Sequence, residues 1–106
     1  MEQKNVNLIK DFAVIIHDLC LQKGYKNIVG CEVIIEEMCD NGIIIREQRA
    51  DDIYIIPIDY RRDIPTLINN ESLKVADAFD YLLYYHPSET KDLFAKELLS
   101  LFERVA

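Results

Sequence analysis

The residues able to carry chemistry in this chain are few, and they lack the spacing of a known catalytic motif. The two histidines are His17 and His86, and no local signature links either one to a serine or a cysteine. A nucleophile needs a general base within hydrogen-bond reach. The S-x-x-K spacing from Ser88 to Lys91 occurs in some acyl-transfer enzymes, but without their companion motifs it indicates an ordinary helix start. The sequence therefore predicts no catalytic residues and a protein that is not an enzyme.

Adjacent carboxylates do not provide a metal site or an acid–base pair either. Glu36 and Glu37, and then Asp51 and Asp52, are neighbours in sequence, and neighbouring side chains on a helix point in different directions. The second pair also lacks the alternating ligands and the glycine of a calcium loop. The three cysteines have unrelated spacings, which disfavour a zinc site and a disulfide framework. They are Cys20, Cys31 and Cys39. With no glycine-rich phosphate loop, we expect no metal and no cofactor.

Length and composition predict a single compact domain over residues 1–106. Half of the residues are hydrophobic, and only three are glycine and three proline, which excludes a disordered chain. No apolar stretch is long enough to span a membrane. Lys10 and Asp11 interrupt the apolar run near the N-terminus, so we expect no signal peptide. We therefore expect a cytoplasmic location.

The charge is acidic and concentrated in the middle of the chain. The net charge is -7, and residues 32–63 contain nine acidic residues against four arginines. Such a balance favours association with basic surfaces. It opposes direct contact with nucleic acid, where lysines and arginines must lie along phosphates.

Three long helices are predicted from hydrophobic periodicity. In the first, Leu8, Ile9, Phe12, Ile15, Ile16, Leu19 and Cys20 share one face, and Gly24 should end the helix. Asn70 is the expected N-cap of a helix from Glu71 to about Tyr85, and Ser88 the cap of the last helix. We expect an α+β fold in which amphipathic helices pack on a small antiparallel β-hairpin or sheet, in the order α-α-β-β-α-α.

The pattern of the central segment predicts a short helix followed by a hairpin. Cys31, Ile34, Ile35 and Met38 follow the spacing i, i+3, i+4, i+7, which places Glu32, Glu36 and Asp40 together on the other side. Asn41-Gly42 can end this helix. The β-branched runs Ile43 to Ile45 and Ile53 to Ile58 then predict two strands joined by a long charged tip, and Pro57 implies an open strand edge.

This segment resembles the back half of a winged helix from Val33 to Ile58. The resemblance implies a winged-helix-like transcriptional regulator in which Arg46, Arg49, Arg61 and Arg62 would grip phosphates. Its recognition helix would carry Glu32, Glu36, Glu37 and Asp40, which would repel DNA. A related alternative is a dimeric adaptor, a homodimer that pairs its hairpins through the exposed edge.

Three tyrosines fall on the polar side of the predicted helix that begins after Asn70. Either another helix covers them or they form a partner-binding surface, because aromatic residues are enriched at interfaces. The expected partner-binding residues are Glu32, Glu36, Glu37, Asp40, Asp51, Asp52, Tyr81, Tyr84 and Tyr85. The acids would steer association and the tyrosines would anchor it.

Together these features predict a small acidic protein-binding module with no direct nucleic-acid or membrane contact. Its partner would be a protein with a basic surface. In general physical style the chain resembles bacterial immunity proteins and phage anti-defence proteins. That resemblance implies an inhibitor that covers a basic site on a nuclease, a toxin or another nucleic-acid enzyme.

Overall fold

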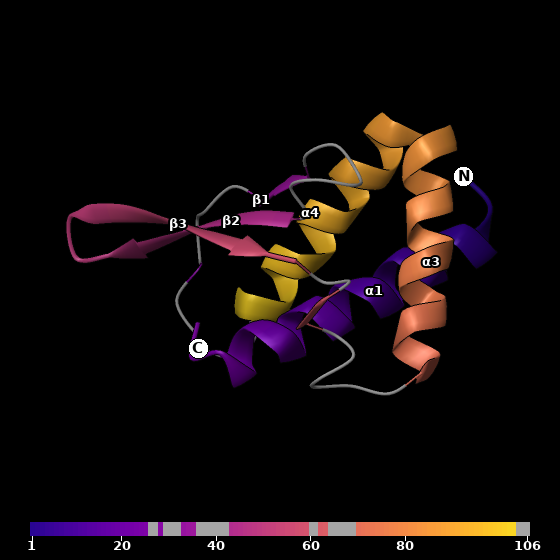
Figure 1. The fold of residues 1–106 in the computed structure, drawn as a ribbon. Helices are drawn as coiled ribbons and strands as arrows, with labels where there is room; N and C mark the ends of the chain where they lie inside the picture. The colour runs from indigo at the N-terminus through magenta and orange to yellow at the C-terminus, as the bar shows by residue number, and fades with distance from the viewer. Residues whose placement is uncertain (26–27, 29–32, 36–42, 60–61, 64–69, 104–106) are drawn as a thin grey trace.

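In the part of the chain that the structure describes, three long helices and a three-stranded sheet make up an α+β fold (Figure 1). The computed structural model describes residues 1–25, 28, 33–35, 43–59, 62–63 and 70–103. The elements in chain order are α1 (Gln3–Gln22), β1 (Val33–Ile35), β2 (Ile43–Arg49), β3 (Asp52–Ile58), α3 (Asn70–Tyr85) and α4 (Pro87–Glu103). The expected α+β class is confirmed. The expected order was wrong in detail, because a strand precedes the hairpin where a second helix was predicted.

Helix α1 forms where periodicity placed it, and Gly24 terminates it as predicted. Its apolar face is buried, including Ile9, Phe12 and Ile16. Gly24 has a φ of 87°, the left-handed conformation that glycine adopts without steric cost. The Tyr25 N–H donates to the Cys20 carbonyl at 2.9 Å and the Gly24 N–H donates to the Leu21 carbonyl at 3.0 Å. These two bonds are the Schellman pattern, which satisfies carbonyls that the helix end would otherwise leave unpaired.

The core is built around three phenylalanines from three helices. The Phe12 ring of α1 stacks on the Phe79 ring of α3, with centroids 4.0 Å apart. The ring centroid of Phe94 in α4 lies 5.4 Å from that of Phe12 and 5.3 Å from that of Phe79. All three side chains are fully buried. The predicted apolar stripes of α3 and α4 therefore meet α1 in one cluster.

Helix α4 starts two residues earlier than its sequence signal suggested. We expected Ser88 to cap the helix, but α4 begins at Pro87 and the Thr90 N–H donates to the His86 carbonyl at 3.0 Å. Proline suits the first helical position because its missing N–H would have no partner there. Only His86 separates α3 from α4, so the two helices are joined by a sharp corner.

The helix expected from Cys31 to Met38 was wrong over Val33–Ile35, which forms strand β1. Val33 pairs with Ile45, Ile34 with Ile44 and Ile35 with Ile43, in antiparallel register. The spacing of a short apolar run does not distinguish a helix from a strand. Three consecutive β-branched residues favour the strand once a matching edge is available on β2. The rest of that predicted helix lies outside the described residues.

The hairpin of β2 and β3 is longer and its turn tighter than predicted. We expected a long tip from Arg46 to Asp52, whereas the register continues to a pair between Arg49 and Asp52, leaving a two-residue turn at Ala50 and Asp51. Cross-strand pairing accommodates the charged residues because alternate side chains point to opposite faces. The hairpin extends away from the helices as an arm (Figure 1). As Pro57 indicated, β3 is an edge strand of this sheet.

Candidate protein-binding surface

The three tyrosines singled out in the sequence lie exposed at the C-terminal end of α3. Phe79, Leu82 and Leu83 take the face of α3 that packs on the core. Tyr81, Tyr84 and Tyr85 are 64, 71 and 57% exposed, so no helix covers them. We call these three residues the tyrosine cluster.

Helical spacing brings the members of the tyrosine cluster into contact. Residues three and four positions apart are neighbours on a helix surface. The ring centroids of Tyr81 and Tyr85 are 4.5 Å apart, and those of Tyr84 and Tyr85 are 5.0 Å apart with an edge-to-face arrangement. A side-chain hydrogen bond with Tyr85, and then the charge of that residue, raise the pKa of Tyr81. The cluster therefore presents rings that support one another.

A pocket of about 530 Å³ lies against the tyrosine cluster. One wall comes from the last turns of α3, including Tyr81 and Tyr85, and the opposite wall comes from the first turns of α1. The volume is within the range of sites that hold small ligands or single side chains. The residues that line it are Lys4, Asn5, Leu8, Ala78, Tyr81, Leu82, Tyr85 and His86.

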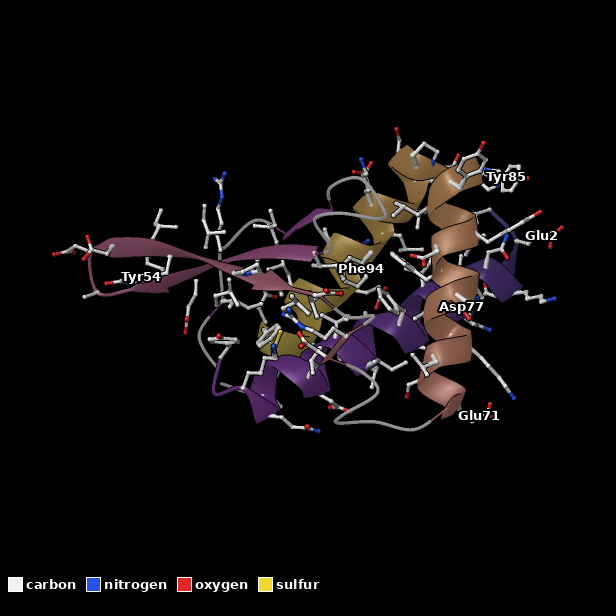
Figure 2. The ribbon with its side chains drawn as sticks, viewed as in Figure 1. Glu2, Tyr54, Glu71, Asp77, Tyr85 and Phe94 are labelled. Atoms are coloured by element: carbon white, nitrogen blue, oxygen red, sulfur yellow. The ribbon has the colours of Figure 1, made fainter. Side chains whose placement is uncertain are left out.

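Polar and charged side chains lie near the tyrosine cluster. Lys4 and His86 line the pocket. Glu2 lies at the same end of the molecule as Tyr85, and Asp77 lies lower on α3, one helical turn before Tyr81 (Figure 2). Mixed charge at the edge of an aromatic patch is the usual composition of a protein interface, with apolar rings at the centre and polar groups at the rim.

The structure separates the predicted partner-binding residues into different regions. Asp51 and Asp52 are exposed at the turn of the hairpin arm. Tyr54 on that arm and Tyr85 on α3 lie at opposite ends of the molecule, whose longest dimension is 38 Å (Figure 2). The turn acids and the tyrosine cluster are therefore two distinct surfaces. The other predicted acids, Glu32, Glu36, Glu37 and Asp40, lie outside the described residues.

Two exposed isoleucines on the arm were not among the predicted site residues. Ile53 is 65% exposed and Ile55 is 62% exposed, and both belong to β3. Their side chains share one face of the sheet with Pro57, while Ile56 and Ile58 on the other face are buried. The sequence signal for them was an isoleucine-rich strand with apolar residues on both faces. Because the helices cover only one face of this strand, the apolar residues on the other face stay exposed.

Cys20 and His17, a candidate nucleophile and one of the two candidate bases, are both core residues. Burial raises the pKa of the Cys20 thiol to about 12, with a smaller opposing effect of Lys23. The thiol is therefore protonated and unreactive at neutral pH. The His17 ring is buried and lies edge-on to Phe102, with centroids 4.6 Å apart. The burial of His17 favours a structural role.

No group of three or more metal-ligating side chains occurs among the described residues. Within the same residues, no helix combines the length and apolar composition needed to cross a bilayer. Comparisons of the chain with protein-family models, curated proteins and solved structures found no match.

Proposed function

We propose that this protein is a small acidic protein-binding module that contacts its partner through the tyrosine cluster. The observation that carries this proposal is the exposure of three mutually packed tyrosines beside a pocket. Tyrosine offers a large apolar surface with a polar tip and few rotatable bonds, so little entropy is lost when it is buried by a partner. Packing between the rings reduces that loss further.

The partner that fits best is a protein with a basic surface. The chain carries a net charge of -7, which accelerates encounter with a positively charged protein. A module of this kind acts by covering a site on its partner, as an inhibitor or immunity-type protein does. A nuclease, a toxin or another nucleic-acid enzyme has a basic site of the required sign.

The winged-helix alternative has less support. Its recognition helix would have included Val33–Ile35, which is strand β1. The acidic charge also opposes binding to duplex DNA. The protein-binding function is therefore better supported than the winged-helix function.

The test is affinity capture of partners with the wild-type protein and with a Tyr81→Ser, Tyr84→Ser, Tyr85→Ser triple variant. The wild type should retain a basic protein from a lysate of the native host, and the triple variant should lose most of that capture. Replacing exposed anchor residues at an interface costs on the order of 2 kcal/mol or more each, or roughly thirtyfold in affinity.

Val14→Ser is the matched control, because Val14 is an exposed apolar residue on α1 outside the tyrosine cluster. It should capture the same protein as the wild type. Equal capture by the triple variant and the wild type would remove the tyrosine cluster from the interface. Capture restricted to acidic proteins would contradict the proposed charge complementarity.

A further inference from the structure

The open edge of β3 carries a second interaction surface, separate from the tyrosine cluster. In the sheet formed by the described residues, β3 pairs with β2 on one side and is the outermost strand on the other. Its apolar side chains Ile53 and Ile55 are more than half exposed. A long apolar edge strand of this kind is a template for pairing with another strand.

The register shows which backbone groups face the open edge. Ile44 faces Pro57, and proline has no N–H to exchange, so this pair is of the non-hydrogen-bonded kind. Such pairs alternate with hydrogen-bonded pairs along an antiparallel ladder. Ile53 and Ile55 are therefore also in non-hydrogen-bonded positions toward β2. Their backbone N–H and C=O groups point away from β2, toward the open edge. Pro57 has no N–H, so it adds no further donor along this edge.

We propose that the occupant of this edge is a second copy of the chain, paired antiparallel through Ile53 and Ile55. In this arrangement Ile53 of one copy faces Ile55 of the other, and each copy uses both of its outward donors and acceptors. The four isoleucines then form one continuous apolar stripe on the outer face of the joined sheet. On the other face, Tyr54 lies opposite Tyr54 of the second copy, and aromatic cross-strand pairs stabilise sheets.

Charge favours a neutral strand such as a second copy of β3 over a charged peptide, and it sets the antiparallel direction. Residues 53–58 contain no charged side chain, so this edge offers nothing to recognise an acidic or a basic peptide. The self-repulsion of a chain with a net charge of -7 is also smallest where neutral segments meet. Parallel pairing would place Asp52 beside Asp52 of the second copy, whereas antiparallel pairing moves these two carboxylates to opposite ends of the contact.

The size of the contact sets its strength. Stable complexes bury about 1,200–2,000 Å² in total, and a contact between two short strand segments buries less than that. The dimer should therefore dissociate on dilution, with a Kd in the micromolar range, unlike an obligate dimer. Because only one edge of each arm is used, the pairing closes after two copies.

The test is sedimentation of the purified full chain across the micromolar concentration range. The wild type should shift from monomer to dimer. Ile55→Lys places like charges near each other across the two-fold axis and should raise the dimer Kd by about tenfold or more. Val14→Lys adds the same charge to an exposed position on α1 and should leave the Kd unchanged. A monomeric wild type, or a Kd unaffected by Ile55→Lys, would overturn the proposal.

A disulfide-trapping experiment checks the register independently of the lysine variants. In a non-hydrogen-bonded antiparallel pair the facing Cα atoms are about 4.5 Å apart, which is within reach of a disulfide. Tyr54→Cys should therefore give an oxidised dimer whose bridge maps to the two introduced thiols. The wild type is the control, because it shows whether the native cysteines form a bridge between two copies without the introduced thiol. Failure to form this bridge, or a bridge that maps elsewhere, would exclude the proposed register.

Discussion

Ala50 is a residue whose backbone conformation is unfavourable for its side chain. It lies in the two-residue turn of the hairpin arm with a φ of 53°, a region in which the Cβ atom crowds the backbone. Turns of this length favour Asn or Gly for that reason. The strain is local and is offset by the cross-strand pairs on either side of the turn.

We expect Ala50→Gly to stabilise the protein by about 0.5–1 kcal/mol, because removing the Cβ atom relieves the turn. Thermal or urea unfolding checks this. Ala95→Gly in α4 is the matched control and should destabilise by about 1 kcal/mol, since glycine is unfavourable inside a helix. A loss of stability for both variants would show that the turn is not strained.

Cys20 makes the stability of the protein depend on pH in the alkaline range. Burial raises the pKa of its thiol from 9.0 to about 12 in the folded state. Above pH 9 the unfolded chain loses the thiol proton and the folded chain keeps it. The free energy of unfolding should therefore fall as pH rises from about 9 toward 12, by up to about 1.4 kcal/mol per pH unit from this group.

Urea unfolding of the wild type and of Cys20→Ala at pH 8, 9 and 10 measures this effect. The variant should have a lower free energy of unfolding at pH 8, because the smaller side chain leaves a cavity. Its pH dependence should be shallower, so the two curves converge as pH rises. Parallel curves would mean that the folded state does not protect the Cys20 proton.

At the scale of the elements, an ion pair joins the end of α1 to the segment that follows β3. The Lys23 Nζ lies 2.7 Å from the Asp63 Oδ2, and these side chains are only 29 and 13% exposed. Partial burial limits screening by solvent and salt. This pair therefore ties the C-terminal end of α1 to residues that follow β3.

A double-mutant cycle with Lys23→Met and Asp63→Asn should give a coupling energy of about 1 kcal/mol. The pair Lys74 and Glu71 on α3 is the control, since its side chains are 74 and 78% exposed at a distance of 3.1 Å. Its coupling should stay below about 0.5 kcal/mol. Equal coupling in both pairs would show that burial of the first pair adds nothing.

At the scale of the whole molecule, the two proposed surfaces lie at opposite ends. The hairpin arm projects from one side and the end of α3 with Tyr85 lies at the other (Figures 1 and 2). A dimer joined through the arms would therefore present its two tyrosine clusters far apart, facing away from the two-fold axis. Such a dimer can engage two partner molecules without a clash between them.

The sequence alone determined the elements whose signals are local. The periodicity of α1, its termination by Gly24, the buried stripe of α3 and the position of three tyrosines away from that stripe follow from side-chain spacing along a single helix. That no other helix covers these tyrosines was decided by the tertiary structure. The open edge at Pro57 follows equally from one missing N–H. Each of these depends on residues within a few positions of one another.

Only the tertiary structure decided what depends on distant partners. Val33–Ile35 is a strand because Ile43–Ile45 offers it a matching edge, and the spacing within the segment does not reveal that edge. The charged segment that was predicted to be a long tip is mostly paired strand, since the β2–β3 register continues to the pair Arg49 and Asp52. The separation of the acidic turn from the tyrosine cluster is likewise a property of packing. Periodicity assigns a side chain to a face of its element, whereas the position of that face in space depends on how the whole chain packs.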